Sequence, residues 1–421
     1  MTRRAWRIAV IGAGPVGLAL ALHARALLPQ ARVTLFDARP ADRDVAADPR
    51  TLALARGSVM FLERLGVWPR VPADTAMPIR RVHVSQLAPA WPPLPGVGTQ
   101  PAVSIDAAEQ GVPHLGVVLA YGALLAPLQA TWFEAAAAEP ARLASRFGTP
   151  VRELKHVDDG VEVDADIAET FDLAVVAEGG VFAEQARKAL VRDYGQTAWV
   201  GQVTLQGTQD PQGAPLAPAG TAFERFTAEG PLALLPLPSG DAGLRRAALV
   251  WCVASARDPV AALDDAQRMA VVNAALPPEA GRVVGITPLK HFALGLNAER
   301  TLVDGPAPGA APGAGRVVRI GNAAQTLHPV AGQGLNLGLR DAHQLVVALR
   351  DAHDLDAALG RVEWARAPDR WTMIAATDLL ARAFTWNLPG LAAVRGAGLA
   401  VLAAAPPLKG LLARRMMYGW R

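Results

Sequence analysis

Apolar positions near the beginning of the chain predict a strand, a glycine-rich turn and a helix. Residues 8–11 (IAVI) contain no polar position, as expected of a parallel strand that is buried on both faces. Gly12, Gly14 and Gly17 follow at G-x-G-x-x-G spacing, and a helical pattern follows them. A second apolar run, residues 33–36, ends at Asp37, twenty positions after Gly17. This order of strand, glycines, helix, strand and acid predicts a dinucleotide-binding unit.

Each glycine of this unit is expected to have its own physical task. The first permits a tight turn, the second lets a pyrophosphate approach the backbone, and the third lets the helix pack against the strand. The helix N-terminus offers free N–H groups and a partial positive charge to phosphates. Asp37 is expected to accept hydrogen bonds from the adenosine ribose. The pattern does not distinguish NAD from FAD.

The next segments predict further elements of this domain. Apolar residues recur at helical spacing from Leu52 to Leu62, ahead of Gly66, which predicts one helix beginning near residue 50. Arg50 stands just before the first turn, where it is either a solvated charge or a contact to the cofactor. Patterns further along predict a strand and helix over residues 115–137, a hairpin over 151–167, and a third strand of the nucleotide-binding sheet over 171–180.

From residue 185 to about residue 288 the pattern changes to a series of strands. They predict a mostly antiparallel sheet, one face of which could cover a ligand. A proline-rich patch at 89–101 and a Gly/Pro segment at 304–315 mark connections between compact parts. The strand-like runs are residues 198–206, 221–227, 230–237 and 246–254.

A late segment predicts a return to the first domain. Residues 317–320 (VVRI) predict a short strand, and a helix with an apolar stripe begins near Leu335. Between them, Gly332-Gln333-Gly334 leaves bare backbone N–H groups at a helix N-terminus, where an anion or a partly negative carbonyl oxygen binds. Because residues 12–37 already account for the adenine half of a dinucleotide, this loop fits its other end, such as a flavin ring. The alternative is a glycine-rich loop between domains.

Length and composition agree with an α/β protein of two or three domains. The chain has 421 residues and a net charge of +3, and no basic block interleaved with aromatic residues predicts nucleic-acid binding. Its single cysteine, Cys252, excludes a disulfide framework and a thiolate metal cluster, and no metal site is expected. We predict a Rossmann-like FAD-binding domain (1–75, 105–184 and 286–355), an inserted mostly antiparallel β-sheet substrate domain (76–104 and 185–285) and a C-terminal helical segment (356–421).

Several segments together resemble the class A flavoprotein monooxygenases. The segments GAGPVGLALA, FERFTAEGPLALLPL and IGNAAQTLHPVAGQGLNLGLRDA run in the family order. Within the family, Gly-Asn followed by AAQTLHP is similar to the aromatic hydroxylases of ubiquinone biosynthesis, the group that includes 2-polyprenyl-6-methoxyphenol hydroxylase. The resemblance implies an ADP site at Gly12, Gly14, Gly17 and Asp37, cofactor contacts from Arg50, Glu178 and Gly179, a ribityl contact from Asn322, and an isoalloxazine site at Pro329, Gly332, Gln333 and Gly334 with Asn336 nearby.

The resemblance also implies the reaction. FAD reduced by NAD(P)H would react with dioxygen to a flavin hydroperoxide, which hydroxylates a lipophilic phenol. No catalytic side chain is expected, because the cofactor carries the chemistry. Phe223, Leu234 and Pro236 are candidates for the apolar substrate pocket, although such residues are equally typical of a strand core. His328 is expected to be a hydrogen-bonded structural residue.

One departure from the family pattern keeps an alternative open. The family's central Asp-Gly motif, which serves FAD and the nicotinamide donor, appears here as Glu178–Gly179, and the residues after it differ from the usual pattern. A polar ribityl contact expected near Ala126 is also missing. The alternative is therefore an accessory protein of a quinone-biosynthesis assembly with the same fold and weak or no activity.

The C-terminal segment suggests a contact with a membrane. From Leu380 onward the chain has no acidic residue but six basic ones, between apolar stretches. Such a segment suits an anionic membrane surface or forms a final helical layer on the protein. No run of about 18 uninterrupted apolar residues predicts a spanning helix. We expect a cytoplasmic protein, associated with the inner face of the cytoplasmic membrane and with other quinone-biosynthesis proteins.

Overall fold

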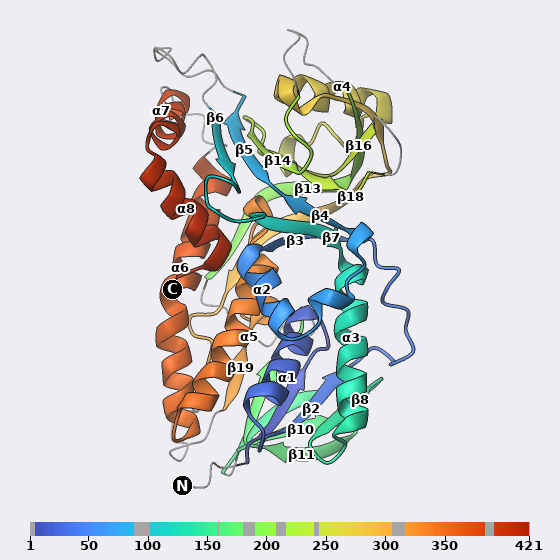
Figure 1. Cartoon of the computed structure of the whole chain (residues 1–421), viewed down its shortest axis with the longest axis vertical. Helices are drawn as coiled ribbons and strands as arrows, with labels where there is room; N and C mark the ends of the chain where they lie inside the picture. Colours follow the sequence, from blue (N-terminus) through green and yellow to red (C-terminus); the bar gives the residue numbers. More distant parts are fainter. Residues whose placement is uncertain are drawn as a thin grey trace.

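A computed structural model describes residues 5–87, 102–158, 160–179, 190–207, 216–239, 244–304, 316–383 and 391–420. The proline-rich patch 89–101 and nearly all of the Gly/Pro segment 304–315 lie outside these ranges, as do the residues that follow Gly179. The two main sheets lie toward opposite ends of the long axis, and a smaller sheet lies between them (Figure 1).

The first main sheet is the predicted nucleotide-binding sheet. Its five strands are all parallel, and β1 lies at the centre. The predicted strands at 8–11, 33–36 and 317–320 are present, and the run at 171–180 contributes the strand next to β1. In spatial order the strands are β19 (Val317–Arg319), β12 (Leu173–Val176), β1 (Arg7–Ile11), β2 (Arg32–Asp37) and β8 (Leu143–Phe147).

Both faces of this sheet are covered, which explains why β1 carries no polar residue after Arg7. Ile8 and Val10 pack into the core formed with the helices, whereas Ala9 and Ile11 face a second apolar cluster. That second cluster belongs to an antiparallel sheet of β9 (Glu153–Val157), β10 (Gly160–Ala165) and β11 (Ile167–Phe171), which contains the predicted hairpin. The helical layer contains α1 (Pro15–Leu27), α3 (Tyr121–Ala138) and α5 (Gly334–Asp351).

The second main sheet has nine strands and is mostly antiparallel, as predicted. Only the pairing of β14 with β5 is parallel among the strand pairs of this sheet in the described residues. One face packs against α4 (Asp265–Ala275). Along the sheet lie β20 (Gln325–Thr326), β18 (Lys290–Ala298), β13 (Leu190–Gln206), β16 (Leu244–Ala254), β15 (Pro231–Leu237), β14 (Thr221–Phe226), β5 (Arg81–Gln86) and β6 (Ala102–Asp106), with β17 (Arg282–Ile286) beside β13.

The predicted helix beginning near residue 50 is partly wrong. Residues Thr51–Ala55 form β3, which pairs with β7 (Gly116–Ala120), and β4 (Ala76–Ile79) pairs with the other edge of β7. Only α2 (Arg56–Arg64) is helical, and Gly66, with φ of +71°, follows its end. The sequence TLALA fits the two-residue period of a strand as well as the helical period. Pairing with the buried strand β7 stabilises the strand over the helix.

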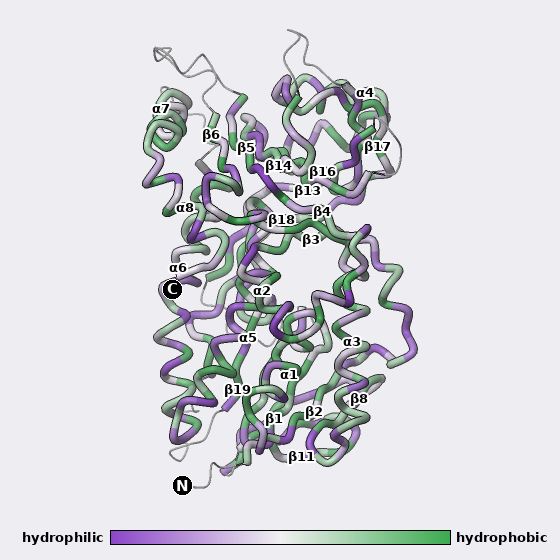
Figure 2. The backbone as a smooth tube through the Cα atoms, in the orientation of Figure 1, coloured by the Kyte–Doolittle hydropathy of each residue, from purple (hydrophilic) through white to green (hydrophobic). Residues whose placement is uncertain are grey.

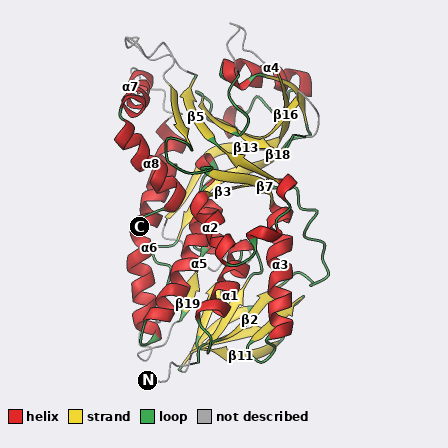
Figure 3. Ribbon diagram, viewed as in Figure 1, coloured by secondary structure: helices red, strands yellow, loops and turns green. Residues whose placement is uncertain are grey.

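The C-terminal segment forms three helices along one side of the molecule (Figures 1 and 3). They are α6 (Leu355–Ala383), which packs on α5, α7 (Leu391–Ala404), which packs on β6, and α8 (Pro406–Tyr418), which packs on α2. No single helix in the described ranges has the length and apolar composition to cross a membrane. Residues 393–404 and 406–418 meet that criterion only as a pair, with a bend of 96° between them.

Strand pairing crosses the predicted domain division in more than one place. β4, within the predicted substrate segment 76–104, pairs with β7 of the predicted FAD-binding segment 105–184. Residues 286–355 were assigned to the FAD-binding domain, but β18 and β20 within them pair into the nine-stranded sheet. The other predicted boundaries stay a prediction. After β18 the chain therefore leaves the nine-stranded sheet, adds β19 to the five-stranded sheet, and returns with β20 before α5 begins.

Candidate functional site

The turn after β1 is built around glycine, and the three glycines have different surroundings. Gly12 has φ of +102°, and a Cβ there would lie 2.7 Å from Cγ of Glu178. A Cβ on Gly17 would lie 1.9 Å from the carbonyl oxygen of Gly12. Gly14 is different, because its nearest neighbour would be the Tyr121 hydroxyl at 3.6 Å, an ordinary contact. Gly14 is also the N-cap of α1, where no side chain caps the helix, so the helix end remains available to an anion.

Asp37 lies beside this turn, but it is not a free acceptor. Its carboxylate accepts hydrogen bonds from the backbone N–H of Ala13 at 2.6 Å and from the backbone and side chain of Arg39. Burial raises the pKa of Asp37, but the bonds from Arg39 and Ala13 outweigh it and hold the pKa below its usual value. Four donors already occupy the carboxylate, so a ribose hydroxyl would have to replace one bond from Arg39. The sequence analysis did not identify Arg39.

Arg50 lies near the same turn through Tyr121. Its guanidinium lies 4.2 Å from the centre of the Tyr121 ring and forms an ion pair with Asp48 at 2.7 Å. The Tyr121 hydroxyl is the atom nearest to the open side of Gly14. Arg50 is largely exposed, so its charge is solvated, and its contact with the cofactor stays a prediction.

Three segments far apart in the sequence meet beside α1. Gly179 faces the side-chain amide of Asn322, whose Nδ2 would lie 3.7 Å from a Cβ on that glycine. Gly321, with φ of +60°, packs against the side chain of Val16 in α1. Oε2 of Glu178 is buried without a hydrogen-bond partner in the described residues. Burial raises the pKa of Glu178, and Asp37 adds to the rise while Arg39 opposes it.

The loop that follows β20 is fixed by His328. Its Nδ1 accepts a hydrogen bond from the Val330 N–H at 3.1 Å, so its Nε2 carries the proton and donates to Oε1 of Gln196 at 2.9 Å. Burial lowers the pKa of His328 to about 4. His328 is thus a neutral, fully bonded side chain, as expected from the sequence. It orients the exposed Pro329 and the short helix η7 (Val330–Gly332).

Two of the predicted isoalloxazine residues serve the protein rather than a ligand. Asn336 donates to the carbonyls of Ala53 and Gly332 and accepts from Ala55 N and from Ser58 Oγ. These bonds use both amide hydrogens and the amide oxygen, so the prediction that Asn336 contacts the cofactor needs correction: it fastens α5 to β3 and α2. Gln333 is buried, and its amide oxygen accepts from Arg340.

The remaining glycines of the loop leave space open. A Cβ on Gly334 would meet no atom within 4 Å, and one on Gly332 would meet only Ala53 Cβ, at 3.3 Å. Gly334 is the first residue of α5, whose N-cap Gln333 makes no side-chain capping bond. The first turn of α5 faces that space, and the binding of a ligand there stays a prediction.

Comparison with known proteins identifies the family. Residues 312–360 match the FAD binding domain family. The chain is 31% identical to 3-demethoxyubiquinol 3-hydroxylase of Escherichia coli over 97% of both chains. It is 33% identical to the ubiquinone hydroxylase UbiL of Rhodospirillum rubrum over 53% of this chain and 48% of the relative. Among solved structures, HpxO of Klebsiella pneumoniae complexed with FAD and uric acid shares the fold, with 17% identity, a TM-score of 0.67, and 98% and 97% of the two chains covered.

This chain belongs to the FAD-dependent hydroxylases of ubiquinone biosynthesis. The resemblance stated from the sequence is thereby confirmed, and the protein is a flavin-dependent monooxygenase. The α/β fold with a C-terminal helical segment is confirmed as well.

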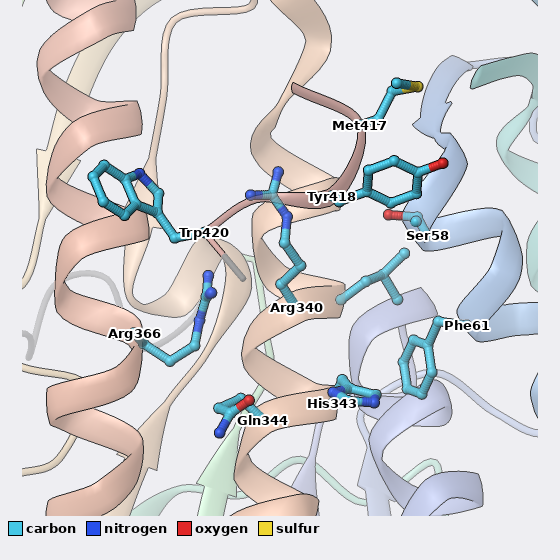
Figure 4. A pocket seen from close by; sticks show the side chains of 11 residues that line it. Ser58, Phe61, Arg340, His343, Gln344, Arg366, Met417, Tyr418 and Trp420 are labelled. Atoms are coloured by element: carbon cyan, nitrogen blue, oxygen red, sulfur yellow. The ribbon is translucent and has the colours of Figure 1, made fainter. Parts of the chain in front are cut away.

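Beside the candidate flavin loop, the monooxygenase has a buried network of ion pairs that no sequence pattern indicates. Figure 4 shows two of its arginines, Arg340 and Arg366, at a pocket that Trp420 also lines. Arg340, which bonds Gln333, also forms a two-oxygen contact with Asp369 at 2.8 Å. Arg366 bonds both Asp369 and Asp341 at 2.7 Å. The backbone N–H of Trp420 donates to Asp369, so the end of the chain closes over this network. Arg340 and Asp341 lie on α5, and Arg366 and Asp369 lie on α6. In the sequence they are ordinary charged helix residues, and only the packing of α5 on α6 shows that they form ion pairs.

The three predicted substrate residues of the hydroxylase lie on one side of the large sheet, and their contact with substrate stays a prediction. Phe223 and Leu234 belong to the apolar cluster that packs against α4. They line a cavity together with Pro236 and Arg245. Phe226, three positions after Phe223, lies on the opposite face and packs on Val330 of the flavin loop. The alternation of residues along β14 predicts two faces of the strand. It does not predict that the face with Phe226, rather than the face with Phe223, packs on the flavin loop.

Proposed function

We propose that this monooxygenase hydroxylates an electron-rich, prenylated phenol of ubiquinone biosynthesis, with FAD as cofactor, NAD(P)H as reductant and dioxygen as oxidant. The observation that carries the proposal is the full-length similarity to a hydroxylase of this pathway, combined with the convergence of three loops on α1. A phenol with electron-donating substituents is common to that relative's named substrate and to the group that the sequence resembles.

The described residues fit FAD. The open sides of Gly14 and Gly334 lie at the uncapped ends of α1 and α5, where backbone N–H groups are free. Glu178, whose Oε2 has no hydrogen-bond partner in the described residues, lies against Gly12, and the amide of Asn322 lies against Gly179. We assign the ADP half to Gly12–Gly17, the ribityl chain to Asn322, and the flavin ring to Pro329, Gly332 and the N-terminal end of α5 at Gly334. When bound, FAD supplies the activation of dioxygen.

The chain's own residues would bind, orient and keep water out. Phe226, Val330, Val84 and Leu380 form an apolar cluster between the large sheet and the flavin loop. Apolar side chains at this place exclude water from the reacting atoms, which oxygen transfer to a ring requires. The bonded His328 and Gln196 hold the loop at a fixed distance from the sheet.

We also propose that α7 and α8 contact an anionic membrane surface, where a prenylated substrate resides. One side of these helices is buried through Ala400, Ala413 and Met417. Leu408, Leu411 and Leu412 of α8 are exposed, and so is the basic Arg414. Figures 1 and 2 show α7 and α8 at one edge of the molecule. This arrangement of apolar and basic side chains is typical of helices that lie in a membrane interface. We place the protein at the inner face of the cytoplasmic membrane.

Stopped-flow absorbance tests the proposed function. Purified protein loaded with FAD is mixed with NADH or NADPH, with and without a 2-prenyl-6-methoxyphenol, and flavin reduction is followed. We expect reduction that the phenol accelerates, and incorporation of one labelled oxygen atom from dioxygen into the product. Absence of phenol-stimulated reduction with both nucleotides would contradict the proposal and favour the accessory-protein alternative.

A further inference from the structure

Glu224 is a buried carboxyl group on the sheet face that meets the flavin loop. Side chains alternate along β14, so Glu224 and Phe226 share one face while Arg225 lies on the other, where its Nε donates to the carbonyl of Ala275 in α4. Phe226 packs on Val330 of the flavin loop. Val84, the residue paired with Glu224 across the parallel ladder, belongs to the same cluster as Phe226.

The surroundings of Glu224 are apolar and leave its carboxyl group unpaired. Its antiparallel neighbour on β15 is Ala233, which pairs in turn with Val250. Oε1 is buried and has no hydrogen-bond partner in the described residues. Burial raises the pKa of Glu224 to about 8. The titratable group that it influences is the buried Cys252 thiol on β16, and no charged side chain pairs with it in the described part of the chain.

Glu224 differs from Asp341 and Asp369, two other buried carboxylates of this chain, and resembles Glu178, whose Oε2 is also buried without a partner in the described residues. Asp341 bonds Arg366, and Asp369 bonds Arg340 and Arg366, so burial there is compensated by paired guanidinium groups. An unpaired buried acid costs stability, and such groups concentrate at functional sites. Glu224 lies deep in the protein, yet the residue keeps part of its accessible surface.

We propose that Glu224 binds the hydroxyl group of the phenol substrate and, when ionised, takes its proton. The inference rests on the proposed function and names the residue that recognises its substrate class. The phenol O–H bond breaks, the proton passes to a carboxylate oxygen of Glu224, and the electron pair remains on the phenolate oxygen. That charge spreads to the ring carbons, which makes the ring a better nucleophile toward an electrophilic oxygen. A hydrogen bond from the phenol also satisfies the carboxyl group that the protein leaves unpaired.

The pH dependence follows from the same environment. An ordinary carboxylate is too weak a base for a phenol, whereas a carboxylate that titrates near pH 8 is better matched to it. The groups facing Glu224 are Val84, Phe226, Ala233 and the Cys252 thiol, whose pKa burial raises above its usual value. None of them carries a charge at pH 7 to 9. Preference for a phenol over its methyl ether should therefore increase as pH rises through about 8.

Ligand binding to the oxidised FAD-loaded protein, without reductant, tests this inference. The probes are 2-methoxy-6-(3-methylbut-2-enyl)phenol and its O-methyl ether, and binding is followed by the change in flavin absorbance between pH 6.5 and 9. The variants are Glu224→Gln, which keeps the size and hydrogen bonding but cannot ionise, and Glu224→Leu, which keeps neither. Glu229→Gln is the matched control, because Glu229 is exposed in the turn after the same strand. FAD content and melting temperature establish that each variant is folded.

We expect wild type and Glu229→Gln to bind the phenol at least tenfold more tightly than the ether at pH 8.5. In Glu224→Leu this preference should fall below threefold while affinity for the ether stays within twofold. In Glu224→Gln the preference should no longer change with pH. If both Glu224 variants keep the preference for the phenol over the ether, or lose affinity for both ligands equally, the role of Glu224 is wrong while the proposed substrate class still stands. Failure of the wild-type flavoprotein to bind the phenol overturns the proposed substrate class together with it.

Discussion

At the scale of single residues, the glycines of the site are required for two different physical reasons. Gly12 and Gly17 are fixed by the protein itself, because a Cβ would collide with Glu178 or with the Gly12 carbonyl. Gly14 and Gly334 face open space. The sequence predicted all four positions from spacing and context. It could not predict Arg39 on Asp37 or the four bonds of Asn336, because those partners are chosen by the tertiary contacts of side chains that have no periodic signature.

Replacing Gly17 with alanine should prevent stable folding of the first domain. The added methyl group would lie 1.9 Å from the Gly12 carbonyl oxygen, so α1 and the turn would have to move apart. We expect a loss of several kcal/mol in the free energy of unfolding, measured by urea denaturation. Gly360→Ala is the control, because that glycine lies within α6 with no atom near its open side and should gain up to about 1 kcal/mol. A Gly17→Ala protein as stable as wild type would contradict this packing.

Glu224 should make stability depend on pH in a predictable direction. Its pKa is about 8 in the folded protein and near 4.5 in the unfolded chain, so between these values the folded state binds more protons. Stability from this group therefore falls as pH rises from about 4.5 to about 8, by up to about 1.4 kcal/mol per pH unit, and then levels. Glu224→Gln removes this slope. We expect its advantage over wild type in urea denaturation to grow across that pH window; a constant difference would show that Glu224 titrates normally.

At the scale of elements, the position of α5 decides the geometry of the flavin loop. The sequence predicted the strand 317–320, the loop and the helix almost residue for residue, because their apolar runs and glycines are local signals. It assigned residues 51–55 to a helix, because their apolar residues fit both the helical and the strand period. Only the pairing with β7 shows that they form a strand. The strand matters to the site, since the Ala53 carbonyl accepts a hydrogen bond from Asn336 of α5 and the Ala55 N–H donates one to it.

Asn336→Ala should detach α5 from β3 and weaken both stability and cofactor binding. The change leaves the buried N–H of Ala55 and carbonyl of Ala53 without their partner. We expect a loss of about 2–4 kcal/mol in the free energy of unfolding, since several buried hydrogen bonds are lost together. Asn322→Ala is the comparison, because its side chain is exposed beside Gly179. It should leave stability of the FAD-free protein unchanged while lowering FAD affinity, and the reverse ranking of the two variants would refute these assignments.

At the scale of the whole molecule, the parallel five-stranded sheet and the mostly antiparallel nine-stranded sheet both adjoin the segment that contains the flavin loop. The sequence predicted both sheets, because a run buried on both faces and a series of alternating strands have different patterns. It did not predict which face of the large sheet meets the loop, nor that β18 belongs to that sheet, because both depend on how distant segments pair. The C-terminal helices add a third part, which closes over the ion pairs behind Gln333 and exposes apolar residues outward.

The outward side of α8 should bind anionic vesicles. We expect the protein to float with vesicles of phosphatidylglycerol and phosphatidylcholine, less with phosphatidylcholine alone, and less at high salt, because basic residues contribute. A Leu408→Ser, Leu411→Ser, Leu412→Ser variant should lose flotation and keep its FAD. Ile167→Ser is the control, since Ile167 is an exposed apolar residue on β11 at the other end of the molecule. Equal flotation of the triple variant and wild type would contradict a membrane role for α8.

FAD affinity of two alanine variants tests most directly whether the two distant glycine loops hold opposite ends of one cofactor. Gly14→Ala and Gly334→Ala place a methyl group in open space at either end of the site, and Gly360→Ala places one in open space far from it. Flavin fluorescence titration of the FAD-free proteins gives the affinities, and thermal melting gives their stability. We predict that both site variants fold like wild type but bind FAD at least tenfold more weakly, while Gly360→Ala binds normally. Wild-type FAD affinity in either site variant would contradict the account.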